Sequence, residues 1–340
     1  MDPTAFFINP DTGLLRSGWR AFLFLMLARA PEIVIGLLVA ALSAGASESN
    51  AAEAAFGSPA QMIPVYAFLV IWLLFLSWLC LRFLERLPLS SLGYHFHRGW
   101  WRDLLLGCGV AAVMMTVIVG LQWIGGGTRI IINPILWQSV ADGRAIDWMG
   151  VWRVAGQMTG ALVLFILAGS FEELLFRGYG FQTLLRAISP VIPILLLSLY
   201  FGVAHLGNPS ATTVSTANTV LAGVWLSVAY LKTRSLWFAT ALHFTWNWMM
   251  GAFFGLPVSG LKLIDRPFLL STSENPVWLT GGDYGSEGGL AVTAILLIAT
   301  LVIWRAKWLH RAAPENESRT PDLAALQLEV RERPASDSGN

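Results

Sequence analysis

The sequence predicts an all-α fold, a polytopic bundle of about eight helices that cross a membrane. Only 13 % of the 340 residues are charged and 55 % are hydrophobic, whereas a soluble domain carries about 25 % charged residues. The apolar residues gather in blocks close to the ~20 residues that a helix needs to cross a bilayer. An isolated strand would leave its backbone groups unpaired in lipid, so each block is expected to be a helix.

Eight apolar blocks give the expected spans in chain order: 21–44, 61–83, 103–124, 157–177, 190–206, 212–231, 236–254 and 289–309. Basic residues gather before the first span and around the ends of the second, fourth, sixth and eighth spans, whereas 45–60 contains no Lys or Arg. The positive-inside rule therefore predicts that both chain termini are cytoplasmic. The even number of spans agrees with this orientation.

Charge and cysteine content exclude other classes of protein. A net charge of +1 gives no strongly basic surface, so no nucleic-acid partner is expected. Cys80 and Cys108 both lie in apolar blocks, which argues against a disulfide framework. The segment "SLGYHFHRGWWRD" before the third span is expected at the membrane interface. The tail 312–340 is polar and free of aromatic residues, so it is predicted to be disordered and cytoplasmic.

Three polar clusters interrupt the apolar blocks of the second half: "FEELLFR" at 171–177, "FGVAH" at 201–205 and "HFTWN" at 243–247. A carboxylate in hydrocarbon costs at least a few kcal/mol, so such residues are rare and usually functional. Glu173 and Arg177 are four residues apart and can pair on one helix face. That pairing leaves Glu172 free for another task.

Spacing also predicts that the three clusters meet. An antiparallel hairpin with its turn at 188–189, within "RAISPVIP", puts Glu172 and His205 at equal depth. His243 and Asn247 are four residues apart and share one face of the seventh span. We therefore expect these four side chains to form one reactive or binding site.

The depths of the two histidines do not agree in this arrangement. His243 lies about eight residues from the loop at 232–235, whereas His205 lies near the outer end of the fifth span. A fourth helix that runs on to about residue 187 would move the turn into the cytoplasm. Glu172 and His205 would then be drawn inward.

Each polar residue also has a purely structural interpretation. A single membrane histidine such as His243 often only joins helices by a hydrogen bond. A Glu–Arg pair in a membrane helix often serves the fold alone, and this is the interpretation favoured for Glu173 with Arg177. Arg29 and Glu32 flank Pro31 in the first span, and they are predicted to form a structural ion pair as well.

The three clusters resemble the motifs EExxxR, FxxxH and HxxxN of the CAAX protease and bacteriocin-processing enzymes (CPBP), the Abi group, related to the type II CAAX prenyl endopeptidases. They read Glu172-Glu173-x-x-x-Arg177, Phe201-x-x-x-His205 and His243-x-x-x-Asn247. The resemblance is strong over 157–254 and rests on hydropathy alone before it. It divides the chain into N-terminal membrane helices with an interfacial segment (1–156), catalytic core helices (157–254), an outer loop with the last span (255–311) and the tail (312–340).

The resemblance implies an intramembrane endopeptidase of the bacterial cytoplasmic membrane. Its partners would be membrane-associated peptides or proteins, processed at CAAX-type ends or at leader peptides. Glu172 would be the general base for a water that it holds together with His205. His243 and Asn247 would donate hydrogen bonds to the oxyanion. The supporting residues would be Glu173, Arg177 and Phe201.

The family is often labelled as metalloproteases, so zinc has to be considered. Glu172, His205 and His243 would supply a ligand set of a kind that zinc accepts. The sequence contains no HExxH motif, and Asn247 suits an oxyanion hole better than a zinc site. No cofactor is therefore favoured, and zinc is left open.

Two other classes of function stay open. A proton-coupled transporter also uses intramembrane Glu and His residues, but it would predict an internal repeat with paired broken helices, and no such repeat is found. A non-proteolytic immunity or scaffold protein of the same fold would tolerate a change of Glu172.

Overall fold

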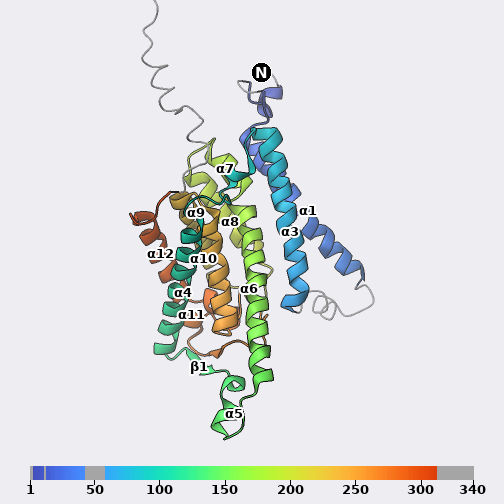
Figure 1. Cartoon of the computed structure of the whole chain (residues 1–340). Coiled ribbons are helices and arrows are strands. Elements are labelled where there is room, and N and C mark those ends of the chain that lie inside the picture. The colour runs from blue at the N-terminus through green and yellow to red at the C-terminus, as the bar shows by residue number, and fades with distance from the viewer. Residues whose placement is uncertain (1–2, 11–12, 43–57, 312–340) are drawn as a thin grey trace, which may run out of the picture.

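The computed structural model describes residues 3–10, 13–42 and 58–311, and helices dominate it (Figure 1). The longer helices are α1 (Ser17–Leu42), α3 (Pro59–Cys80), α4 (Trp100–Ile124), α6 (Trp148–Phe176), α8 (Val191–Ala204), α9 (Thr213–Thr233), α10 (Leu236–Trp248) and α12 (Leu290–Arg305). The short ones are α5 (Gln138–Ala141), α7 (Tyr179–Leu185) and α11 (Val277–Thr280). π-Helical turns at Leu81–Glu85 and Met249–Phe253 extend α3 and α10. The predicted disordered tail at 312–340 lies outside the described residues.

All eight expected spans contain a helix, but not all of these helices are long enough to cross a membrane. Five described helical segments have the necessary length and hydropathy: Ser17–Ala41, Pro59–Glu85, Trp100–Ile124, Trp148–Leu185 and Thr213–Thr233. α8, α10 and α12 have 14, 13 and 16 residues. A helix of 14 residues is about 21 Å long, short of the ~30 Å hydrocarbon core. The expected count of about eight transmembrane helices is therefore not confirmed.

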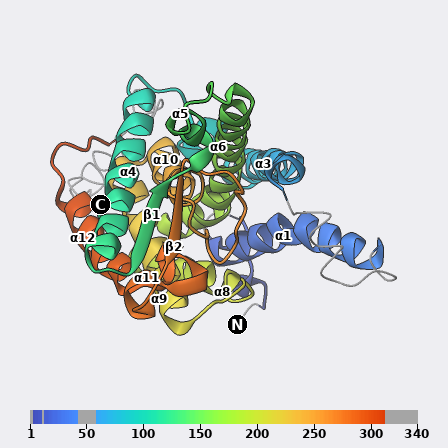
Figure 2. The same ribbon diagram turned by 90° about the horizontal axis from the view of Figure 1, so that it is seen from below.

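α10 lies between α4 and α6 and also packs on α9 (Figure 1, Figure 2). Its side chains are buried nearly all round, and Phe238 and Leu242 are fully inaccessible. A helix that is apolar on every side belongs in the interior of a bundle. The two polar motif residues of α10, His243 and Asn247, are thereby placed inside the protein.

The fourth expected span is broken directly after the EExxxR motif. A Cβ at Gly178 would lie 2.1 Å from the carbonyl oxygen of Leu174, so only glycine fits where α6 ends and α7 begins. The chain therefore reaches Leu185 in two helices, not in one helix that runs to about 187. The predicted turn at 188–189 is confirmed, between α7 and α8.

α1 is attached to the bundle mainly through its N-terminal half. There Arg20 Nη1 lies 2.7 Å from Glu85 Oε1, and the Phe24 ring lies 5.1 Å from the ring of Tyr179. Its C-terminal half leans away from the other helices (Figure 1) and leaves Leu37 66 % exposed. α1 thus has one packed end and one loosely packed end.

A small sheet covers the end of the bundle where α4 ends and α6 begins (Figure 1). β1 (Thr128–Ile132) pairs antiparallel with β2 (Leu269–Ser273). The sequence predicted only outer loops here, so the all-α prediction missed this pair. Each strand has only five residues and its partner lies far away in the sequence, so neither segment carries a strong strand signal.

Candidate active site

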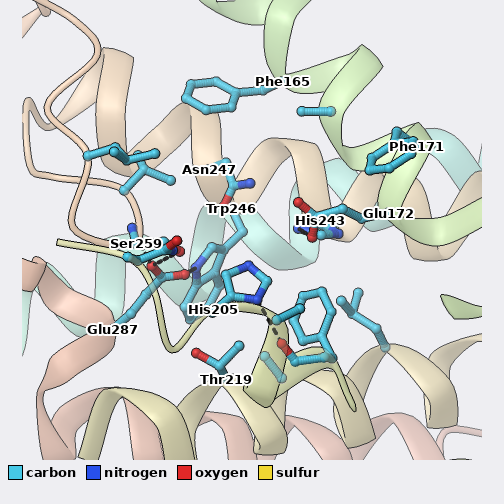
Figure 3. Close-up of a pocket in the computed structure, with 18 of the residues that line it drawn as sticks. Phe165, Phe171, Glu172, His205, Thr219, His243, Trp246, Asn247, Ser259 and Glu287 are labelled. Atoms are coloured by element: carbon cyan, nitrogen blue, oxygen red, sulfur yellow. Dashed lines mark hydrogen bonds and ion pairs between the residues drawn. The ribbon is translucent and has the colours of Figure 1, made fainter. Parts of the chain in front are cut away.

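One cavity of about 240 Å³ is lined by all four residues predicted to form the site, Glu172, His205, His243 and Asn247. Glu172 comes from α6, His205 from the C-terminal end of α8, and the other two from α10. Figure 3 draws Glu172 beside His243, with Asn247 further along the same helix and His205 facing them from α8. The structure therefore brings together residues that are up to 75 positions apart in the sequence.

His243 lies between the two adjacent glutamates of α6. Its Nδ1 is 2.8 Å from Glu173 Oε1, and its Nε2 is 3.7 Å from Glu172 Oε2. The sequence grouped His243 with Asn247 and did not predict that its ring would link both glutamates. Oε2 of Glu172 is buried and has no hydrogen-bond partner among the described residues, so this oxygen can accept a hydrogen bond from a reactant.

The predicted pair of Glu173 and Arg177 is present and almost completely buried. Arg177 Nη1 lies 3.0 Å from Glu173 Oε1, and the two side chains are 1 % and 0 % exposed. Arg177 also donates to the carbonyl of Gly223 in α9, at 2.8 Å. A buried carboxylate needs such a partner to stay ionised. Because Glu173 then only accepts hydrogen bonds, the proton of its bond with His243 is on Nδ1 of the histidine.

The orientation of His205 is fixed by its own helix. Its Nδ1 lies 2.7 Å from the carbonyl oxygen of Phe201, and a carbonyl oxygen can only accept, so Nδ1 carries the proton. The rings of His205 and Phe201 are 4.7 Å apart. In the neutral imidazole, Nε2 of His205 is then left with a lone pair.

The wall opposite α6 contains residues that the sequence did not single out. Glu287 precedes α12, and its carboxylate accepts from Trp246 Nε1 at 3.0 Å and from the backbone and hydroxyl of Ser259 at 2.8 Å. These contacts hold the segments before and after β2 against the cavity (Figure 3). The sequence signal for this wall is an acidic residue, Glu287, directly before the last apolar block. The sequence predicts only an outer loop for 255–288 and therefore misses it.

α1 and α3 form a third wall of the same cavity. Arg29 and Glu32 pair as predicted, with 3.0 Å between Nη2 and Oε2, yet both side chains line the cavity together with Met62 and Tyr66 of α3. The sequence predicts a structural ion pair and does not predict that both residues line the cavity. The positions of the apolar blocks in the sequence do not show which face of the first span packs against the fourth span.

The donor atoms do not form a metal site as they stand. Within residues 3–10, 13–42 and 58–311, no group of three or more His, Cys, Asp or Glu side chains could hold a metal ion. Of the three residues considered as zinc ligands, Glu172 and His243 are neighbours, with 3.7 Å between Oε2 and Nε2. Nδ1 of each histidine is engaged, by Glu173 and by the Phe201 carbonyl.

Comparison with known families supports the same part of the chain. Residues 155–249 match the family described as type II CAAX prenyl endopeptidase Rce1-like. The match runs from α6 to α10 and includes all seven residues that define the EExxxR, FxxxH and HxxxN motifs. No curated protein and no solved structure matches the chain. The predicted family resemblance is confirmed over this segment. Together with the five described helical segments that are long and apolar enough to cross a membrane, it supports an integral membrane protein.

Proposed function

We propose, from the Rce1-like segment and the cavity that it lines, that this protein is an intramembrane endopeptidase in which Glu172 activates a water molecule. The observation that carries the proposal is the convergence of Glu172, His205, His243 and Asn247 on one cavity between apolar helices. Its substrates are membrane-associated peptides with CAAX-type ends or leader peptides. Both termini of the chain lie in the cytoplasm, and the membrane is the bacterial cytoplasmic membrane.

Glu172 is the general base and later the general acid. Its Oε2 takes a proton from water while the water oxygen attacks the carbonyl carbon of the scissile bond. Nε2 of His205, which carries a lone pair when Nδ1 donates to Phe201, accepts the second hydrogen of the water and orients it. When the tetrahedral intermediate collapses, the C–N bond breaks and Glu172 returns its proton to the leaving amine.

His243 and Asn247 stabilise the oxyanion. With Nδ1 of His243 held by Glu173 at 2.8 Å, only Nε2 can reach the reactants, and it donates when the ring is protonated on both nitrogens. The Asn247 side-chain amide supplies a second donor one helical turn further along α10. Glu173 and Arg177 are positioning residues, because they fix the His243 ring without lining the cavity.

Hydrolysis is proposed to proceed without a metal ion. The argument is the donor geometry, since the three candidate ligands do not form a metal-binding group among the described residues. Elemental analysis of the purified protein checks this. We expect the same zinc content in the wild type and in His243→Ala, whereas stoichiometric zinc that is lost in His243→Ala would contradict the metal-free mechanism.

The proposed function is tested with the purified full-length protein in liposomes and a prenylated CAAX peptide. Glu172→Gln keeps the size of the side chain but removes the base, so turnover should fall by a factor of about 100 to 10 000. Glu287→Gln is the matched control, because this glutamate lines the same cavity but is held by Trp246 and Ser259. Unchanged turnover in Glu172→Gln would overturn the assignment. No turnover by the wild type would favour the scaffold or transporter alternatives.

A further inference from the structure

Arg29 is the only Arg or Lys side chain among the described residues that line the cavity. The other acidic or basic side chains of the lining are Glu32, Glu172 and Glu287 and the two histidines His205 and His243. Glu287 is fully engaged by Trp246 and Ser259. Arg29 is thus the one lining side chain, among the described residues, that is always a cation, and it belongs to the wall formed by α1.

The guanidinium of Arg29 has unused donors. Its partner in the described part of the chain is Glu32, through Nη2 alone at 3.0 Å, whereas a guanidinium carries five N–H groups. The Arg29 side chain is 32 % exposed. Arg177 differs, because it uses Nη1, Nη2 and Nε on three different groups and is 1 % exposed. Arg29 therefore has donors to offer to an acceptor that enters the cavity.

The surroundings of Arg29 connect it to the reactive carboxylate. Tyr66 of α3 is close enough to interact electrostatically with Arg29, Glu32 and Glu172. Glu32 and Glu172 also interact with each other. The remaining wall between them is apolar, with Met62 and Phe171 among its side chains. A charge–charge contact is stronger in such a medium than in water.

We propose that Arg29 is the residue that binds the free C-terminal carboxylate of the substrate. The proposal rests on the endopeptidase function proposed above and names a residue that recognises its substrate. A carboxylate matches the planar fork of a guanidinium. An internal stretch of a membrane protein has no such group and would leave Arg29 with Glu32 alone. α1 and α12 lie on opposite sides of the bundle (Figure 2), so the cavity wall formed by α1 is the one away from α12.

Removing the charge of Glu32 distinguishes the proposed subsite from a purely structural ion pair. If the pair only supported α1, then removing either charge would harm the protein in the same way. In the proposed subsite, Glu32 competes with the substrate carboxylate for Arg29. Arg29→Gln and Glu32→Gln should therefore change the preference for a free carboxylate in opposite directions.

The experiment compares two prenylated CAAX peptides of identical sequence, one with a C-terminal carboxylate and one with a carboxamide. For the wild type, kcat/KM should be about 10- to 100-fold higher for the carboxylate, as expected for a charge-assisted hydrogen bond. In Arg29→Gln this ratio should fall to about one, and in Glu32→Gln it should stay the same or rise. An unchanged ratio in Arg29→Gln, or an equal fall in both variants, would overturn the proposal.

Binding of the same peptides to Glu172→Gln separates the two proposals. Tighter binding of the carboxylate peptide, lost when Arg29→Gln is added, supports the subsite even if the wild type cleaves neither peptide, in which case the endopeptidase proposal fails. Cleavage of both peptides at equal rates, with equal affinities, leaves the endopeptidase proposal standing and overturns the subsite.

Discussion

Two Arg–Glu pairs lie on the helices around the cavity, each within a single helix, and they differ in burial, in hydrogen-bond partners and in sequence spacing. Glu173 and Arg177 on α6 are buried, and they hold His243 and α9 in place. Arg29 and Glu32 on α1 are 32 % and 22 % exposed and contact each other. The first pair stands behind the cavity wall, whereas the second stands in the wall itself.

The difference shows that an Arg–Glu pair within a membrane helix can either support the fold or line a binding cavity. Each pair neutralises charge within a membrane helix, and both were predicted to be structural. Burial separates them, because a fully engaged ion pair fixes its surroundings and a half-exposed pair can exchange partners. The α6–α10 side is therefore the rigid side, suited to chemistry, and the α1 side is the adaptable one, suited to receiving a substrate.

Arg177→Met tests the rigid side and should have the largest effect. It leaves Glu173 as a buried carboxylate without its cation, which should cost about 3–5 kcal/mol of unfolding free energy. Chemical unfolding in detergent micelles measures this loss. Adding Glu173→Gln removes the stranded charge and should restore part of the stability. If Arg177→Met lost less unfolding free energy than Arg29→Met, the pair on α6 would not be the one that stabilises the fold.

Asn247→Ala tests whether the rigid side carries chemistry as well as stability. Loss of one oxyanion donor should lower kcat by about 100- to 1000-fold, with a smaller change in KM. Steady-state kinetics on a prenylated peptide measures both. Thr219→Val is the control, because Thr219 lines the same cavity but its hydroxyl bonds Ser215 O at 2.8 Å. Equal losses in the two variants would contradict the role of Asn247.

Arg29→Met tests the adaptable side and should have the smallest effect on stability. A half-exposed pair within one helix contributes less than about 1 kcal/mol, and the methionine keeps most of the apolar stem. The same unfolding measurement in detergent applies, so the two arginines are compared directly. A loss as large as that of Arg177→Met would mean that α1 is held in place by this pair.

The motif residues could be predicted from the sequence because helical spacing is a local property. Positions four apart share a helix face, which is enough to pair Glu173 with Arg177 and to align His243 with Asn247. The hairpin turn at 188–189 also follows from its local composition. These predictions needed no knowledge of how distant helices pack.

The remaining features depend on contacts between distant segments. The link from His243 to both glutamates requires the crossing of α6 and α10, and the position of Glu287 requires the last loop to fold back over the cavity. The break at Gly178 depends on a 2.1 Å approach to a backbone oxygen, which no hydropathy pattern contains.

The central claim, that Glu172 drives peptide hydrolysis in the membrane, is tested most directly by comparing new peptide termini. Membranes from cells that express the wild type or Glu172→Gln at equal levels are analysed by mass spectrometry of protein ends. We expect termini that occur only with the wild type, close to the C-termini of membrane-associated proteins. Identical sets of termini at equal expression would contradict the claim.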